Sequence, residues 1–274
     1  MSRHAFIDFS QLGKTFTTPK GSFWAVKDFN LRIPEGQFVC LVGHSGCGKS
    51  TVLSMLAGLQ TPTEGVIILA GKEVTGPGPD RGVVFQSPCL LPWLSAFNNV
   101  LLGVGQAFPQ MRAAERASLT RRFLELVGLA DDMDKMPAEL SQGMRQRVGI
   151  ARALALNPKV LLLDEPFGML DGLTRIELQQ ELLRIWESDQ KTVLMVTHDV
   201  DEAVFLADKV VMMTNGPEAR VGRIIDIDLE RPRNREAVLD DPHFYRLRGE
   251  LLAFLENPDQ NQGSHPAEPV SLPA

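Results

Sequence analysis

The chain has 274 residues, of which 44% are hydrophobic and 23% charged, as is usual for a globular protein with a sizeable core. This composition excludes a collagen-like, low-complexity or wholly disordered chain. Acidic residues outnumber basic ones by 34 to 28, a formal net charge of −6, and we expect no nucleic-acid partner, because binding to a phosphate backbone depends mainly on Lys and Arg.

The cysteines and the apolar runs indicate the compartment. Cys40, Cys47 and Cys89 form no Cys-x-x-Cys pair, so we expect reduced thiols in a cytoplasmic protein, with no disulfide framework and no zinc site. The N-terminus has no apolar stretch of secretory length. No run approaches the ~18 apolar residues that span a bilayer, so any action at a membrane is expected from its surface.

In the first third of the chain, strands are predicted around a glycine-rich loop. Residues 25–33 alternate apolar and polar side chains, as a half-buried strand does. Residues 37–42 form a short apolar run that ends at a glycine, which is typical of a fully buried strand. Residues 50–59 repeat apolar side chains at helical spacing, and residues 66–70 and 82–85 are further short strands.

The rest of the chain changes first to helices and then back to alternating strands and helices. Helices are predicted at 112–127, 143–156 and 173–188, and strands at 159–163 and 192–196. Strands that alternate with helices favour an α/β fold with a largely parallel sheet. The helical stretch at about 97–156 is predicted to be an insertion into that fold.

Residues 43–50 match the phosphate-loop pattern Gly-x4-Gly-Lys-Ser/Thr in full. In such a loop the backbone N–H groups turn toward an anion, and the following helix directs the positive end of its dipole there. Lys49 can reach the β- and γ-phosphates, and the Ser50 hydroxyl can ligate Mg²⁺. An ordinary glycine-rich turn is the alternative, but the strand before the loop and the helix after it favour nucleotide binding. The expected ATP-binding residues of this segment are Gly43, His44, Ser45, Gly46, Cys47, Gly48, Lys49, Ser50 and Thr51.

Two adjacent carboxylates, Asp164 and Glu165, follow the apolar run at residues 160–163. They are predicted to lie at the carboxyl end of a buried strand, where open parallel sheets bind ligands. Asp164 suits Mg²⁺, and Glu165 suits polarisation of an attacking water. A strand that ends in Asp-Glu can simply be solvated, but together with the phosphate loop it predicts a nucleoside triphosphatase.

Between these two motifs, Leu140-Ser141-Gln142-Gly143-Met144 resembles the signature loop of the ABC transporter ATPases. Further residues resemble those of the same family and follow in its order along the chain. Phe16 resembles the aromatic residue that stacks on adenine, and Gln86 resembles the Q-loop glutamine. Met169-Leu170-Asp171 resembles the D-loop, and His198 resembles the switch histidine. Trp24 is a second candidate for the adenine contact. The resemblance covers about residues 6–222 and implies a P-loop NTPase core with a mostly parallel sheet, an antiparallel β subdomain and an inserted α-helical subdomain.

The resemblance also implies a mechanism. Two such domains would close head to tail over two ATP molecules, so that Ser141 and Gly143 of one copy contact the γ-phosphate held by the other. Gln86 would join Ser50 and Asp164 at Mg²⁺. His198 would hold the γ-phosphate and the water that Glu165 polarises, which makes these two the expected catalytic residues.

One departure from the family pattern concerns the signature loop. The commonest form is Leu-Ser-Gly-Gly-Gln, whereas this chain has Gln142 and Met144 at two of those positions. Gly143 is retained, and only glycine lets a backbone approach phosphate without a Cβ clash.

The resemblance implies boundaries and partners as well. An ABC ATPase domain is expected at 5–225, with its helical insertion at about 97–156, a C-terminal extension at 226–256 and a disordered tail at 257–274. The implied partners are membrane permease subunits, a solute-binding protein reached through the permease, and a second ATPase, either an identical copy or a paralogue. The implied location is the cytoplasmic face of the inner membrane, as a peripheral subunit.

The segment Leu90-Leu91-Pro92-Trp93 is a candidate docking site for the permease, because exposed apolar clusters usually mark partner surfaces. Local packing beneath the helical insertion is the alternative. Within the family this segment resembles importers of nitrate, sulfonates such as taurine, bicarbonate or cyanate, and residues 230–248 resemble the nitrate branch most. Two alternatives of other classes fit less well. A soluble, non-transport ABC ATPase usually has a long coiled-coil insertion, and the helical stretch here is too short for one. A purely structural nucleotide-binding module is expected to lack Glu165 or His198, and both are present.

Overall fold

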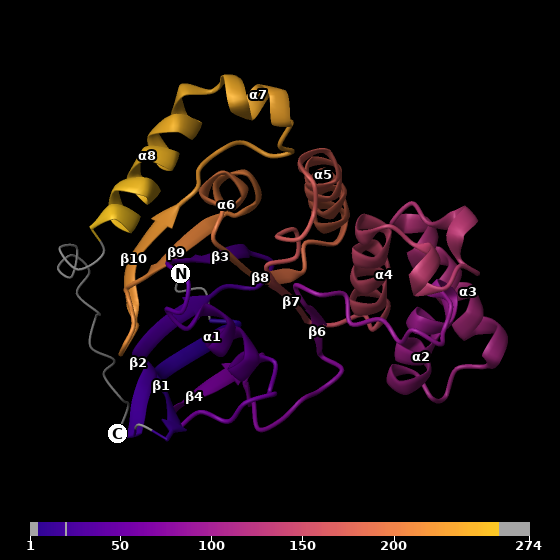
Figure 1. Ribbon diagram of the computed structural model, residues 1–274, viewed down its shortest axis with the longest axis horizontal. Helices are drawn as coiled ribbons and strands as arrows, with labels where there is room; N and C mark the ends of the chain where they lie inside the picture. The colour runs from indigo at the N-terminus through magenta and orange to yellow at the C-terminus, as the bar shows by residue number, and fades with distance from the viewer. Residues whose placement is uncertain (1–4, 20, 258–274) are drawn as a thin grey trace.

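Two β-sheets organise the part of the chain that this computed structural model describes, residues 5–19 and 21–257 (Figure 1). The strands are β1 Ile7–Thr18, β2 Gly21–Ile33, β3 Phe38–Val42, β4 Glu64–Leu69, β5 Lys72–Glu73, β6 Arg81–Val84, β7 Val160–Asp164, β8 Thr192–Thr197, β9 Lys209–Met213 and β10 Val221–Asp226. The helices are α1 Lys49–Leu56, α2 Ala96–Ala107, α3 Ala113–Leu126, α4 Gln142–Ala155, α5 Gly172–Asp189, α6 Val200–Leu206, α7 Arg235–Asp240 and α8 Pro242–Glu256, with two 3-10 turns, Ala130–Asp132 and Pro137–Glu139.

The larger sheet has the strand order β10-β9-β3-β8-β7-β6. All its neighbouring pairs are parallel except β10 with β9, as predicted for a mostly parallel sheet. The parallel register sets Val42 beside Thr197, and Asp164 beside Val196. The strands β3, β7 and β8 therefore end at one edge of the sheet, which is where ligands bind in folds of this class.

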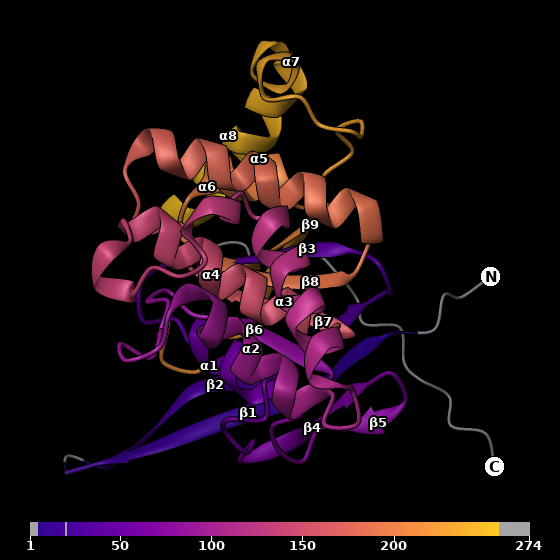
Figure 2. The same cartoon turned by 90° about the vertical axis from the view of Figure 1, so that its right-hand side faces the viewer.

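Both faces of the larger sheet are covered, which explains why its strands are continuous apolar runs rather than alternating ones. Alternate residues of β3 point to opposite sides: Val39 and Leu41 pack with α1 and the smaller sheet, whereas Phe38 and Cys40 pack with α4, α5, α6 and α8. Figure 2 shows this layering, with α5 and α6 on one side of the larger sheet and β1, β2 and β4 on the other.

The smaller sheet, β2-β1-β4-β5, is antiparallel throughout, as expected. The helices α2, α3 and α4 lie between β6 and β7 in the chain, although β6 and β7 are hydrogen-bonded neighbours. These helices therefore form an insertion that projects to one side of the molecule (Figure 1). No helix in the described ranges has both the length and the apolar character that a membrane crossing requires.

Several elements were not predicted from the sequence. The strand β1 is interrupted by register shifts near Gln11 and Lys14, and Gln11 has a φ of 49°, so its alternation pattern is broken. The strands β5, β9 and β10 and the helices α6, α7 and α8 were also missed. Residues 258–274, nearly all of the predicted disordered tail, lie outside the described residues.

Candidate functional site

Four loops meet at the carboxyl edge of the larger sheet. The phosphate loop follows β3, Glu165 follows β7, His198 follows β8, and Gln86 comes two residues after β6. The parallel pairing of these strands is what brings the loops together. This edge therefore collects the predicted phosphate-binding, carboxylate, glutamine and histidine residues in one place.

The phosphate loop turns sharply into α1. Gly46 and Gly48 have φ values of 81° and 93°, a region that favours glycine. A Cβ on Gly48 would also lie 2.7 Å from Cγ2 of Val26, so β2 closes the space behind the loop. Because α1 begins at Lys49, its first backbone N–H groups point into this turn, as an anion site requires.

Lys49 is buried, and its ammonium group lies inside the loop. The Nζ atom donates to the carbonyl oxygens of Gly43 at 2.7 Å and His44 at 3.0 Å. Cys47 fills the remaining space, with Sγ 3.9 Å from the same Nζ. Burial raises the pKa of the Cys47 thiol, against the opposing charge of Lys49, so the thiol stays protonated at neutral pH.

Ser50 and Asp164 are joined directly. The Ser50 hydroxyl donates to Oδ1 of Asp164 at 2.8 Å. Burial raises the pKa of Asp164, and the neighbouring charge of Glu165 adds to that effect, while Ser50 and Lys49 oppose it. A hydroxyl and a carboxylate oxygen next to a phosphate loop are the donors that Mg²⁺ prefers, so this pair fits the metal that the family implies.

Glu165 lies between Gln86 and His198. Its Oε2 accepts a hydrogen bond from Nε2 of Gln86 at 3.0 Å, and its Oε1 lies 3.5 Å from Nδ1 of His198. The residue has a φ of 46°, which is uncommon outside glycine, and its backbone N–H donates to Val196 of β8 at 2.9 Å. The carboxylate is thus held at a sharp bend, beside an imidazole that is 63% exposed.

The position of His198 depends on a buried network that sequence analysis missed. Thr197, directly before it, donates to Oε2 of Glu202 at 2.5 Å and accepts from the backbone N–H of Asp199 at 3.0 Å. The other oxygen of Glu202 accepts from Gln179 of α5 at 2.8 Å. The available signal was the spacing of Asp199 and Glu202, since the Asp199 side chain caps α6 by accepting from the Glu202 N–H at 3.0 Å.

The two candidates for the adenine contact differ in their surroundings. Phe16 is half-buried, with its ring 6.1 Å from that of Phe23 and the Lys14 ammonium 5.5 Å from its centre. Trp24 covers Gly13, where a Cβ would lie 2.9 Å from the indole ring. Phe16 pairs with Phe23 across the strands whereas Trp24 pairs with Thr15, so the two aromatic rings point to opposite faces of the sheet.

Within one chain, the signature loop lies apart from the phosphate loop. Ser141 caps α4, its Oγ accepting from the Met144 N–H at 3.2 Å. Gly143 packs against α5, where a Cβ would lie 2.4 Å from Cγ2 of Thr174. Gln142 contacts the predicted D-loop through Sδ of Met169 at 3.8 Å. Figure 1 shows α4 at the helical side of the molecule, away from α1, so the predicted site residues fall into two separate groups.

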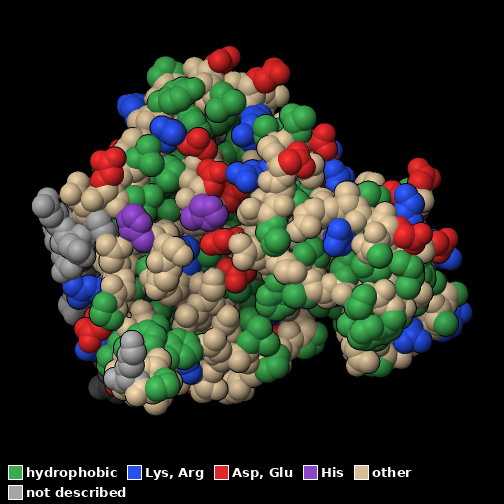
Figure 3. All heavy atoms as spheres, viewed as in Figure 1, with side chains coloured by type: hydrophobic (Ala, Val, Ile, Leu, Met, Phe, Trp, Pro, Cys, Tyr) green, Lys and Arg blue, Asp and Glu red, His purple; other side chains and the backbone are tan. Residues whose placement is uncertain are grey.

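The surface of the molecule also separates the main body, which carries the phosphate loop, from the helical insertion. On the face drawn in Figure 3, histidine and acidic side chains gather near the middle of the molecule. A notch separates the main body from the helical insertion, and hydrophobic side chains lie on both sides of it. Near the Q-loop, Trp93 is 69% exposed, whereas Leu90 is partly buried and packs against the core, so local packing accounts for Leu90 but not for Trp93.

Comparisons with known proteins agree with the geometry. A family model described as ABC transporter matches residues 26–168. The nitrate import ATP-binding protein NrtD of Synechococcus elongatus is 54% identical, with 91% of each chain covered. The bicarbonate transport ATP-binding protein CmpD of Synechocystis is 51% identical, covering 92% of this chain and 90% of that protein. The nitrate transport protein NasD of Klebsiella oxytoca is also 51% identical, covering 91% of this chain and 95% of that protein.

Solved structures show the same fold. The dimeric structure of a bacterial ABC transporter cassette has a TM-score of 0.74 and 34% identity, covering 82% of this chain and 100% of that one. The cbiO1 protein of Clostridium perfringens, part of an ABC transporter complex, has a TM-score of 0.72 and 25% identity, covering 92% of this chain and 98% of that one.

Proposed function

This chain belongs to the ABC transporter family, and from that premise we propose that it is the ATP-hydrolysing subunit of a membrane importer for nitrate or nitrite. The observation that carries the hydrolytic part is the position of Glu165 between Gln86 and His198, beside the Ser50–Asp164 pair and the phosphate loop. The nitrate part rests on two relatives named for nitrate transport, at 54% and 51% identity.

The phosphate loop and Lys49 bind the triphosphate of ATP. The oxygens of Ser50 and Asp164 hold Mg²⁺, with Gln86 as a further oxygen donor. Bound Mg²⁺ supplies charge neutralisation on the phosphate oxygens. Glu165 accepts the proton of the attacking water at its carboxylate, and His198 donates a hydrogen bond to the γ-phosphate. Phe16 stacks on adenine, with Trp24 as the second candidate.

Two ATPase chains act together in this proposal. The Ser141 hydroxyl already accepts from Met144, so its own proton remains to be donated. In a head-to-tail pair, Ser141 and the Gly143 N–H of one chain donate to the γ-phosphate bound by the other. A solved relative is a dimeric cassette, which supports this arrangement. The second chain is an identical copy or a paralogue.

The same proposal places the protein on the cytoplasmic face of the inner membrane. Trp93 and the nearby Gln86 form the docking site for permease subunits, which in turn bind an extracytoplasmic solute-binding protein. The ATPase domain occupies residues 5–225, with the insertion at about 97–156 and the C-terminal extension at 226–256.

Bicarbonate is the closest rival cargo, because a bicarbonate transport relative is 51% identical to this chain. Sulfonate or taurine and cyanate importers are further alternatives that keep the same motor. A soluble ABC ATPase without a permease is the alternative of a different class, and the exposed Trp93 favours a membrane partner over it.

The test is solute uptake in a host whose gene for this chain has been deleted. We expect uptake of labelled nitrate to be lost and to return with the wild-type chain but not with Lys49→Ala. Loss of bicarbonate or taurine uptake, with nitrate uptake intact, would keep the motor and contradict the cargo. If purified protein with Lys49→Ala hydrolysed MgATP at the wild-type rate, the motor itself would be wrong.

A further inference from the structure

Four arginines of the C-terminal extension contact the helix that follows the switch histidine. The helix α6 begins at Val200, two residues after His198, and has only seven residues. A helix this short is not stable without tertiary contacts. Its position, and with it the position of His198, depends on the groups that hold its two ends.

Arg233 holds the carboxyl end of α6. Its side chain is more than nine-tenths buried, and Nη1 donates to the carbonyl oxygens of Val204 at 3.3 Å, Phe205 at 2.9 Å and Ala207 at 2.7 Å. The last carbonyls of a helix have no partner within it, so this guanidinium supplies the donors they lack. Burial lowers the pKa of Arg233 to about 10, which leaves it charged at neutral pH.

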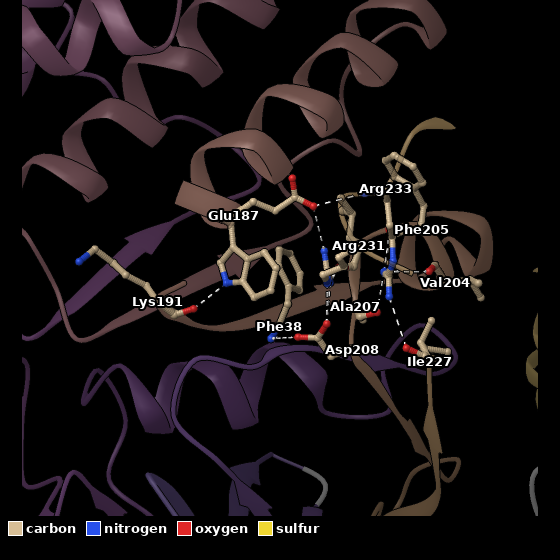
Figure 4. Close-up of polar contacts among 12 residues, drawn as sticks. Phe38, Glu187, Lys191, Val204, Phe205, Ala207, Asp208, Ile227, Arg231 and Arg233 are labelled. Carbon is tan, nitrogen blue, oxygen red and sulfur yellow. Dashed lines mark hydrogen bonds and ion pairs between the residues drawn. The ribbon is translucent and has the colours of Figure 1, made fainter. Parts of the chain in front are cut away.

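Arg231 fixes the same end to the core of the fold. Its guanidinium stacks 4.2 Å from the ring centre of Trp186 and donates to the Leu206 carbonyl at 2.7 Å. It also donates to Oδ1 of Asp208 at 2.8 Å, while the other oxygen of Asp208 accepts from the Phe38 N–H at 2.9 Å. Figure 4 shows both arginines converging on the end of α6, with Glu187 of α5, which pairs with Arg231, on the other side.

Arg248 of α8 holds the amino end of α6. Its Nε lies 2.5 Å from Oδ1 of Asp201, three residues after His198. Arg235 of α7 also contacts the helix near its carboxyl end: its guanidinium lies 5.2 Å from the ring centre of Phe205 and donates to Oε1 of Gln179 at 2.9 Å. Gln179 in turn donates to Glu202, which accepts from Thr197, so a hydrogen-bonded chain runs from the extension to the residue next to His198.

We propose that Arg231, Arg233, Arg235 and Arg248 are positioning residues for His198, through α6, and that the C-terminal extension thereby sets the rate of ATP hydrolysis. The proposal depends on the role proposed above for His198 in hydrolysis. The contacts of these arginines lie on or next to α5 and α6, whereas the extension meets the phosphate loop at a separate point, where Nε2 of His44 lies 2.7 Å from the Leu255 carbonyl oxygen, so loss of the arginines acts on kcat more than on the KM for ATP.

The test uses the full chain and the exposed pair Arg248–Asp201, whose removal leaves the core intact. Arg248→Ala and Asp201→Ala are each expected to lower kcat about two- to fivefold, the range of an exposed ion pair, with KM for MgATP changed less than about twofold. The double variant should be no slower than either single variant, because both remove one contact. Arg248→Lys, which keeps the charge, should restore part of kcat.

The matched control is Arg223→Ala. Arg223 lies on β10 and forms a similarly exposed ion pair with Glu250 of α8, at 3.0 Å. This pair joins α8 to β10, whereas Arg248–Asp201 joins α8 to α6. We expect kcat to stay at the wild-type value. If Arg223→Ala and Arg248→Ala slowed hydrolysis equally, the effect would come from docking of α8 in general and the proposal would be wrong.

His198→Ala separates this proposal from the function on which it depends. If that variant hydrolysed ATP normally, the role of His198 would fail, and the positioning proposal with it. If His198→Ala abolished hydrolysis while Arg248→Ala and Asp201→Ala kept the wild-type kcat, only the positioning proposal would be overturned. An equal fall in kcat and rise in KM would also overturn it, since it would indicate a general structural effect.

Discussion

Glu165 is the residue on which the proposed chemistry depends most. One of its oxygens accepts from Gln86 and the other faces His198, so replacing a carboxylate oxygen by an amide nitrogen changes the proton acceptor with little change in shape. We expect Glu165→Gln to bind MgATP and to lower kcat by about 10²–10⁴-fold, the usual contribution of a general base.

The same variant tests the pairing of two chains. With hydrolysis blocked, ATP should remain between the phosphate loop of one chain and the signature loop of the other, and light scattering should show a dimer with MgATP. A variant that stayed monomeric with MgATP and still hydrolysed it would contradict both the role of Glu165 and the head-to-tail pair.

Gly143 has a structural reason to be glycine that the sequence did not show. A Cβ there would lie 2.4 Å from Cγ2 of Thr174, so Gly143→Ala should push α4 away from α5. We expect a loss of about 1–3 kcal/mol in the free energy of unfolding, the usual effect of overpacking, measured by denaturant unfolding.

The second substitution Thr174→Ser separates two roles of Gly143. It removes the clashing methyl group, so Gly143→Ala with Thr174→Ser should regain most of the lost stability. If glycine is also required for backbone approach to phosphate, ATPase activity should stay low in this double variant. Recovery of both stability and activity would show that packing on α5 is the only requirement at this position.

At the scale of one element, α6 carries a buried acid that makes its stability depend on pH. Burial raises the pKa of Glu202, although the hydrogen bonds from Thr197 and Gln179 oppose the shift. Because the folded pKa is above the unfolded one, the folded state is favoured by protonation. This contribution is fully present below the unfolded pKa and is lost as the pH rises through the folded pKa.

Glu202→Gln cannot ionise and so should not show this loss. We therefore expect the free energy of unfolding of the variant minus that of the wild type to increase as the pH is raised from 4 to 8, because only the wild type loses stability over this range. Denaturant unfolding at each pH measures the difference, and Glu125→Gln, an exposed site on α3, is the control. Equal pH profiles for the wild type and Glu202→Gln would contradict the prediction.

The elements differ in how far the sequence could predict them. The strands β3 and β7 were predicted because both faces of each are buried and the apolar run stops at the site. From their parallel direction it followed that Gly43 and Asp164 meet at one edge. The strand β1 could not be predicted in the same way, since its bulges break the alternation.

The C-terminal helices and the support of α6 were missed for another reason. The buried stripe of α8, Phe244, Leu247, Leu251 and Phe254, is spaced as a helix requires but lies among charged residues. Of the arginines that hold α6, Arg231 and Arg233 donate to backbone carbonyls far away in the chain, and such contacts follow from tertiary packing alone. Motif spacing therefore predicted that the residues proposed to be catalytic meet at one edge of the sheet, but not the groups proposed to position them.

At the scale of the whole molecule, exposed apolar side chains indicate which faces meet partners. Met169 and Leu173 beside the signature loop are 56% and 76% exposed, and Trp93 near the Q-loop is 69% exposed. The first pair lies where a second ATPase chain is proposed to bind. Trp93 is on a loop that Asn99 holds through hydrogen bonds to Leu91 and Leu94, so its exposed position is well defined.

Trp93→Ala should therefore separate hydrolysis from transport. The side chain makes little contact within the chain, so the unfolding free energy and the ATPase activity of the isolated protein should stay close to wild type. An aromatic anchor at an interface contributes about 2 kcal/mol or more, roughly 30-fold in affinity for the permease, so binding to the permease and solute uptake should both fall. Tyr245→Ala on α8, 55% exposed and far from the Q-loop in sequence, is the control and should keep both. If Trp93→Ala bound the permease and drove uptake as well as Tyr245→Ala, the docking site would have to lie on another face, and the exposed apolar residues beside the signature loop would be the next to test.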